Sequence, residues 1–99
     1  MYKRQIYFGG NDDKLYAVRA SDGSLIWASS LGGGTNTYPA AAGGVVYFGG
    51  NDSRLYALRA SNGTQLWNHP VPGGLTTDLA VARGMVCFGS RNRLYAVRA

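Results

Sequence analysis

The sequence predicts an all-β protein built from tandem repeats, and three observations lead to this prediction. Residues 6–27 return forty positions later as residues 46–67 with 14 of 22 positions identical, and a third copy begins at Leu94. Short β-branched and aromatic runs alternate with glycine-containing turns. No stretch of a dozen residues is free of such turns, which excludes helical repeats of similar length. Four short strands in a period of roughly 40–45 residues are typical of a β-propeller blade.

Ten strands are expected, each ended by a turn in which glycine, asparagine or aspartate is favoured. They cover residues 5–9, 14–20, 25–29, 37–42, 45–49, 54–60, 65–68, 77–82, 85–89 and 93–99. Because a blade lies between two neighbours, its middle strands should be apolar on both faces, as residues 45–48 and 55–58 are. We therefore expect antiparallel four-stranded blades and about two and a half of them in the chain.

The chain divides into one complete and two incomplete blades. Residues 1–99 are interpreted as a single propeller fragment, with a partial blade at 1–31, a blade at 32–70 and a partial blade at 71–99. The first blade lacks its inner strand and the third lacks its outer strand in this alignment. Since a propeller needs about four to eight blades to close, we expect several copies to complete a ring as a homo-oligomer, with a dimer as the first choice.

Bulk composition excludes some classes of protein. Apolar residues make up 45% of the 99 residues, which is too many for a disordered chain. The longest apolar runs are only a few residues, so no membrane span and no signal peptide are expected in this chain, and its location is left unassigned. The net charge of +5 would favour acidic partners, but the basic residues recur with the repeat and form no run.

A motif of alanine, glycine and tryptophan carries a resemblance to a known family. It reads Ala17-x-x-x-x-x-Gly23-x-x-x-Trp27 and is repeated forty positions later at Ala57, Gly63 and Trp67. This block resembles the tryptophan-docking motif of pyrroloquinoline-quinone-type propeller repeats, which occur in quinoprotein dehydrogenases and in an outer-membrane-assembly lipoprotein of the same fold. The resemblance implies that each indole lies between adjacent blades, on the glycine turn of the neighbour. Members of this family are often periplasmic or extracellular.

The motif departs from the family pattern at two positions. The family's aspartate is replaced by Arg19, Arg59 and Arg98, and its threonine by Asp22 and Asn62. The polar link across the turn could persist with its polarity reversed, from arginine to the residue three positions later. The arginines could equally point into solvent. Both alternatives stay open at this stage.

No catalytic residue is expected, and we predict that the chain is not an enzyme. His69 is the sole histidine and has no nucleophile or metal-ligand pattern beside it. Asp12, Asp13 and Asp52 stand at hairpin turns, where aspartate is favoured for backbone reasons, and Cys87 replaces a tyrosine of the repeat. No metal and no cofactor are expected, the quinone included, because the residues that hold the quinone in the dehydrogenases lie outside the repeat motif.

The remaining candidate is a surface at one end of the blades. The turns between the second and third strands of each blade share this end with the loops that join blades, and their basic residues form a candidate partner-binding rim of Lys14, Arg54, Arg91 and Arg93. Propellers commonly bind ligands and partners at such an end. The leading interpretation is therefore a non-enzymatic module for protein interaction, scaffolding or self-assembly, possible partners being another copy, another protein or an acidic ligand. The alternatives are a fragment of a quinoprotein oxidoreductase and, less favoured, a module that binds polyanions or nucleic acid.

Overall fold

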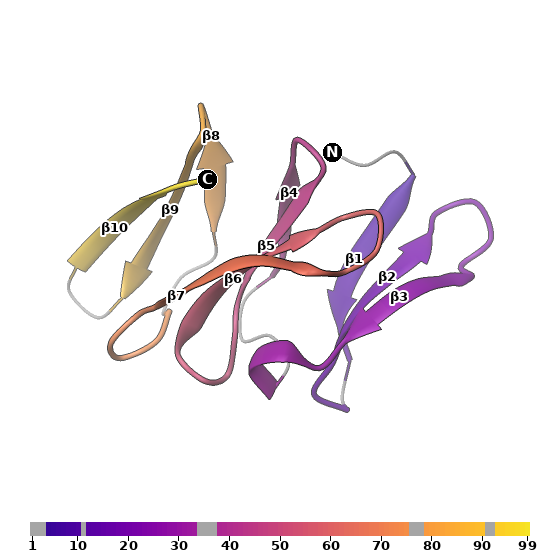
Figure 1. Ribbon diagram of the computed structural model, residues 1–99, viewed down its shortest axis with the longest axis horizontal. Helices are drawn as coiled ribbons and strands as arrows, with labels where there is room; N and C mark the ends of the chain where they lie inside the picture. Colours follow the sequence, from indigo (N-terminus) through magenta and orange to yellow (C-terminus); the bar gives the residue numbers. More distant parts are fainter. Residues whose placement is uncertain (1–3, 11, 34–37, 76–78, 91–92) are drawn as a thin grey trace.

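The described residues form three antiparallel sheets that lie side by side (Figure 1). The computed structural model describes residues 4–10, 12–33, 38–75, 79–90 and 93–99. The first sheet has the order β1-β2-β3, the second β4-β5-β6-β7 and the third β8-β9-β10. The all-β propeller-blade architecture predicted from the repeat is confirmed.

The strand bounds follow the sequence prediction closely. In chain order they are β1 Gln5–Gly9, β2 Leu15–Arg19, β3 Leu25–Ser29, β4 Ala40–Ala42, β5 Val45–Gly49, β6 Arg54–Arg59, β7 Gln65–Pro70, β8 Ala80–Ala82, β9 Met85–Ser90 and β10 Arg93–Arg98. A short 3-10 helix, η1 Leu31–Gly33, stands in the first loop, where only an irregular connection was expected.

The inner strands are shorter than predicted. β4 begins at Ala40, directly after Pro39, because proline has no backbone N–H to donate to a ladder. Its equivalent β8 begins at Ala80, and the other expected strand residues 37, 77 and 78 lie outside the described residues. β4 and β8 lie next to each other, which brings the alanine-rich inner strands of two sheets together.

The hairpin between the two outer strands has the same backbone hydrogen bonds in the first and second sheets. In the second sheet the N–H of Arg59 donates to the carbonyl of Thr64 at 2.7 Å, and the N–H of Gly63 donates to the carbonyl of Arg59 at 2.8 Å. Gly63 has a φ of +75°, a left-handed conformation that glycine adopts without a steric penalty. The turn is therefore fixed by the sequence itself, before any neighbour is added.

In each of the three sheets a stacked aromatic pair joins β1 to β2, β5 to β6 or β9 to β10. Phe8 stacks on Tyr16 at 5.5 Å between ring centroids, and the corresponding pairs in the second and third sheets lie at 5.2 Å. Each pair faces directly across two neighbouring strands. Such cross-strand contacts stabilise the pairing and fix its register.

The core consists of two layers, one between each pair of adjacent sheets. The first layer joins Leu15, Ala17 and Trp27 to the second sheet, and the other joins the second sheet to Val86 and Phe88 of the third. β5 and β6 are consequently buried on both faces, whereas β1 and β10 each have exposed residues on one face. The second sheet is thus the centre of the molecule.

This burial predicts an order of amide exchange. We expect the amides of β5 and β6 to exchange with solvent most slowly and those of β1 and β10 to exchange faster, because only the central sheet is covered on both sides. Hydrogen exchange followed by NMR measures each strand directly. Equal protection in β1 and β5 would contradict a core centred on the second sheet.

Candidate functional site

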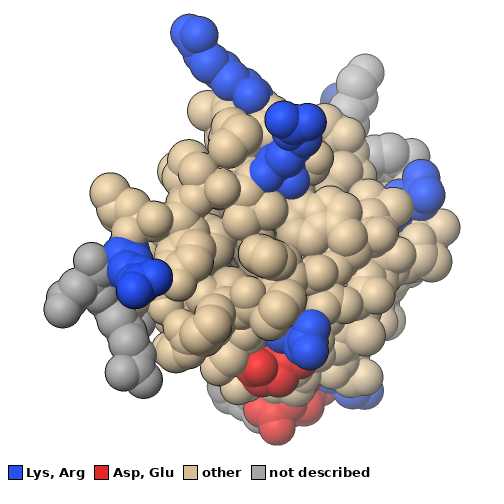
Figure 2. All heavy atoms as spheres, turned by 60° about the vertical axis from the view of Figure 1, so that its left-hand side comes forward, with Lys and Arg blue, Asp and Glu red and all other residues tan. Residues whose placement is uncertain are grey.

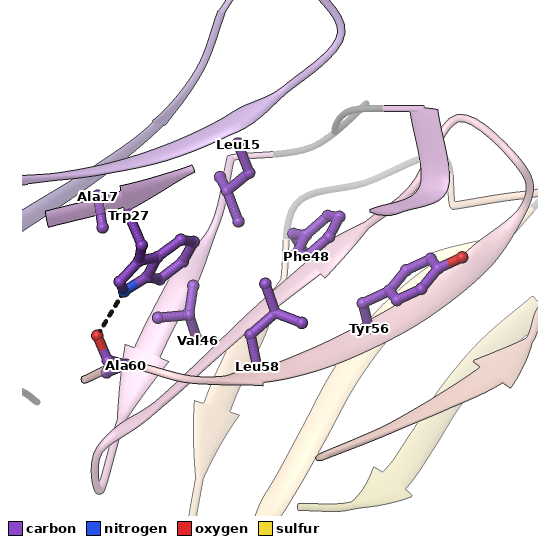
Figure 3. Packing of buried hydrophobic residues seen from close by; sticks show 8 residues of the cluster. All are labelled: Leu15, Ala17, Trp27, Val46, Phe48, Tyr56, Leu58 and Ala60. Carbon is purple, nitrogen blue, oxygen red and sulfur yellow. Dashed lines mark hydrogen bonds between the residues drawn. The ribbon is translucent and has the colours of Figure 1, made fainter. Parts of the chain in front are cut away.

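The contact between neighbouring blades is centred on Trp27. Its indole is 7% exposed and packs beside Val46 and Leu58 of the second sheet (Figure 3). The indole N–H donates a 2.7 Å hydrogen bond to the backbone carbonyl of Ala60. A buried indole N–H without an acceptor would be costly, so this bond fixes how the first sheet is positioned along the second.

Gly63 gives the indole its room. A Cβ atom built on Gly63 would lie 2.7 Å from the Trp27 ring, closer than real Cβ atoms approach their neighbours. Glycine is therefore required here twice, for the left-handed turn and for the close approach of the ring. The tryptophan of one blade and the glycine turn of the next form one contact, as the resemblance implied for this pair.

Trp67 has different surroundings from those of Trp27. It is only half-buried and packs against the second core layer, at 6.0 Å from the ring of Tyr47. The described residues of the third sheet end at β10 and include no outer-strand turn that could correspond to Gly63. The two tryptophans of the repeat therefore make unequal contacts, which the sequence pattern did not reveal.

The outer face of the first sheet is apolar and uncovered. It consists of Ile6, Phe8, Tyr16 and Val18, which share one face through the β1–β2 register. Ile6 is 52% exposed and Phe8 is 42% exposed, whereas their repeat equivalents Val46 and Phe48 are fully buried against Trp27's sheet. The first sheet thus presents to solvent the kind of surface that the second sheet buries.

The outer face of the third sheet has no aromatic side chain among its described residues. Through the β8–β9–β10 register it consists of Ala80, Ala82, Met85, Cys87, Leu94, Ala96 and Arg98, of which only Met85 is half-buried and the rest are exposed, with Leu94 94% exposed. Figure 2 turns this side of the molecule forward and shows a broad uncharged surface with separate basic side chains around it. The protein therefore has two uncovered blade faces on opposite sides, and they differ in residue composition.

The residues of the basic rim are exposed at strand starts. Lys14 precedes β2, Arg54 opens β6 and Arg93 opens β10, while Arg91 lies outside the described residues. The guanidinium of Arg54 donates to the side-chain carbonyl of Asn68 on β7 at 2.7 Å. In the view of Figure 2 the basic groups are scattered and do not form one patch. A role for this rim in partner binding stays a proposal.

The loops at this end of the blades contact one another. The turn from 50 to 53 reaches the first inter-sheet loop through Asn51, which donates to the carbonyl of Gly33 at 2.8 Å. On the other side, the N–H of Val71 donates to the carbonyl of Ser53 at 2.9 Å. One turn of the central blade thus links both inter-sheet connections.

Two aspartates have a side-chain role that the sequence interpretation missed. The hydroxyl of Tyr56 donates to Asp52 at 2.5 Å, and Tyr16 donates to Asp12 in the same way. The interpretation of these aspartates as turn residues for backbone reasons alone was therefore incomplete. The signal was present as Asp-x-x-x-Tyr, which occurs in both complete copies of the turn.

The polar link of the turn runs to the residue two positions after the aspartate or asparagine. Asp22 accepts hydrogen bonds from the backbone N–H of Ser24 at 3.0 Å and from its hydroxyl at 2.7 Å. These bonds, together with the charge of Arg19, hold the pKa of Asp22 below its ordinary value. Asn62 and Thr64 repeat the arrangement. Arg19 and Arg59 are exposed, and the hydrogen bonds that close the two turns come from Ser24 and Thr64.

Nothing in the described part of the chain points to a metal site or to a helix that crosses a membrane. No group of three histidine, cysteine, aspartate or glutamate side chains among these residues could hold a metal ion. No helix found there has the length and apolar character needed to span a bilayer.

Solved structures share this arrangement of blades. The chain is similar to BamB from Moraxella catarrhalis, with a TM-score of 0.79 and 18% identity over 99% of this chain and 31% of that one. The quinohemoprotein alcohol dehydrogenase ADHIIG from Pseudomonas putida HK5 gives a TM-score of 0.75 and 28% identity over 87% of this chain and 15% of that one. The computationally designed Ika4 protein gives 0.79 and 14%, over 99% and 62%. The chain thus spans 31% of the BamB structure and 15% of the dehydrogenase structure. No curated protein sequence matches.

The blades and their tryptophan–glycine contact define a class, the β-propeller proteins with repeats of the pyrroloquinoline-quinone type. The family model of the outer membrane protein assembly factor BamB matches residues 2–99, and the chain belongs to this family. The resemblance recognised from the repeat is thereby confirmed.

The unequal burial of the tryptophans predicts unequal costs of truncation. Trp27→Ala should lower the free energy of unfolding by about 3–5 kcal/mol, as for other buried aromatic residues. Trp67→Ala should cost clearly less, because its indole is half-buried. Urea unfolding of both variants measures the difference. Equal losses would contradict the distinction between the two contacts.

Tyr56 predicts a loss of stability at high pH. Burial and then the hydrogen bond to Asp52 raise the pKa of Tyr56 from 10.0 to about 12. The unfolded chain therefore loses this proton before the folded chain does. The contribution is fully present below pH 10 and is lost as pH rises toward 12.

Urea unfolding between pH 9 and 11.5 tests this expectation. The free energy of unfolding should fall less steeply with pH in Tyr56→Phe than in the unchanged chain, because the shifted hydroxyl is gone. Tyr38→Phe changes an exposed tyrosine and serves as the control. If the Tyr56→Phe slope matched both others, ionisation of Tyr56 would not be linked to unfolding.

Proposed function

We propose that this chain is a non-enzymatic propeller module that binds protein through its uncovered blade faces, and that in solution it assembles with copies of itself. The observation that carries the proposal is the repeat equivalence of two faces. The outer face of the first sheet has the residue types and register of the face that the second sheet buries. A surface of this composition is stabilised when another blade covers it.

The two outer faces support a head-to-tail contact. The outer face of the first sheet carries Phe8 and Tyr16, whereas that of the third sheet has no aromatic residue and combines small residues with leucine, methionine and arginine. The same pairing of a large-residue face with the opposite face of a neighbour occurs twice within the chain. Contacts between unlike faces generate rings when the rotation closes. Two copies would bring six sheets together, which lies in the range of about four to eight blades in propellers.

An interaction role also fits the chemistry of the described residues. His69 lies exposed on β7, and Cys87 lies exposed on the outer face of the third sheet, so these two groups stand in different sheets. The Tyr56–Asp52 pair is an internal contact of one blade, and the Tyr56 hydroxyl is protonated at neutral pH. The proposal therefore assigns no catalytic residue to this chain.

A fragment of a quinoprotein oxidoreductase is the second candidate, because the chain is 28% identical to a quinohemoprotein alcohol dehydrogenase over 87% of its length. Dye-linked alcohol oxidation with added quinone distinguishes the two candidates. The interaction proposal expects no turnover above that of a protein-free control. Turnover that follows the protein concentration would support the oxidoreductase instead.

Self-assembly is tested by light scattering at micromolar concentration. We expect a particle heavier than one chain, and we expect Phe8→Glu to reduce it to a monomer, because a carboxylate on the outer face of the first sheet cannot be buried without a partner. Leu66→Glu is the matched control, since Leu66 is 41% exposed and Phe8 is 42% exposed.

The control separates this face from general surface charge. Leu66 lies on β7 of the central sheet, away from either outer blade face. Its variant should keep the mass of the unchanged chain. A folded monomer for the unchanged chain, or equal dissociation in both variants, would refute assembly through this face.

A further inference from the structure

The equivalent turns of the first and second sheets differ in what lies above their glycines. A Cβ atom on Gly63 would collide with the Trp27 ring, whereas a Cβ atom on Gly23 would meet no atom of the described residues within 4 Å. The two turns are otherwise alike, with φ of +75° and +74°. Gly23 therefore stands where an indole is seated in the next blade, and no side chain of the described residues occupies this place.

The rest of the contact is also in position around Gly23. The N–H of Arg19 donates to the carbonyl of Ser24 at 2.8 Å, and Gly23 donates to Arg19 at 2.7 Å, as their equivalents do in the second sheet. Ala20 is exposed, whereas its equivalent Ala60 is buried and accepts the indole N–H of Trp27. The turn thus has the conformation of an occupied site without its occupant.

The floor of this place is apolar in the same register. Ile6 and Val18 face one another across β1 and β2, as Val46 and Leu58 do beneath Trp27. In the close-up of Figure 3, Val46, Leu58 and Ala60 lie around the Trp27 indole. Ile6 and Val18, the Gly23 turn and the Ala20 backbone are here called the open indole site.

We propose that the open indole site binds the side chain of a tryptophan presented on an extended strand of another protein. This inference rests on the proposed interaction function and names the feature that the partner must carry. Apolar contact with Ile6 and Val18 holds the ring, and the Ala20 carbonyl accepts the indole N–H. A phenylalanine would fill the space but leave that acceptor unmatched.

The tryptophan that binds the open indole site belongs to the partner, because both tryptophans of this chain are already packed. Trp27 is already seated on the second sheet, and Trp67 packs into the second core layer. The described strands of the third sheet contain no tryptophan, so a second copy that covers the first sheet with its third would leave the open indole site unfilled. Assembly and indole binding are therefore separate events that separate measurements can follow.

5-Fluoroindole is a suitable probe, because fluorine NMR reports its binding without interference from Trp27 and Trp67. A ligand of this size should bind with a dissociation constant of about a millimolar. Methylation of the indole nitrogen should weaken binding about fivefold, because the hydrogen bond to the Ala20 carbonyl is then lost. Equal binding of the two probes would overturn the proposed orientation.

Gly23→Asn places a side chain in the site while asparagine still tolerates the left-handed turn. It should weaken 5-fluoroindole binding about tenfold by occupying the space of the ring. Gly84→Asn is the matched control, because Gly84 has the same φ of +75° and also has nothing within 4 Å of its Cβ position. Ile6→Gln provides a second variant that alters the floor and leaves the turn intact.

The outcomes separate this inference from the proposed function. Weaker binding in Gly23→Asn and Ile6→Gln, with unchanged binding in Gly84→Asn, supports the open indole site. Unchanged binding in the two site variants overturns it, whatever the particle mass in light scattering. A monomeric chain that binds the probe at this site would instead refute assembly alone, and circular dichroism confirms that each variant is folded.

Discussion

The stacking of one blade on the next is the interaction on which the rest of the structure depends. A sheet of three or four short strands has two broad apolar faces, and each is removed from water only by a neighbour. The contact is directional because the Trp27 indole reaches past the sheet to the Ala60 carbonyl and the Gly63 turn. One side chain therefore fixes both the distance between two blades and their relative position.

This dependence explains why the repeats are similar in sequence but unequal in environment. Phe48 and Phe8 occupy the same position of the repeat, yet the first is buried and the second is 42% exposed. The difference lies in whether a neighbouring blade is present and not in either strand. Uncovered faces of this kind favour association with another blade, and their shape and register restrict which surface can be accommodated.

The loop end of the blades is held together by a separate set of polar contacts. The central turn bonds to both inter-sheet loops through Asn51 and Ser53, and Tyr56 anchors the same turn through Asp52. These bonds fix the positions of the described loop residues relative to the blades.

The sequence alone determined the class of fold, the strands and the turns, because each depends on residues close together in the chain. Glycine at 23 and 63, the aromatic pairs and the alternation of short runs were sufficient for these features. The sequence also revealed the tryptophan motif through its resemblance to a family. It could not reveal that Trp27 and Trp67 differ, that Asp52 accepts from Tyr56, or that Gly23 is uncovered while Gly63 is not. Those properties belong to contacts between blades or between a turn and its strand. Equivalent residues of the repeat differ in burial when only one copy has a neighbouring blade on that side.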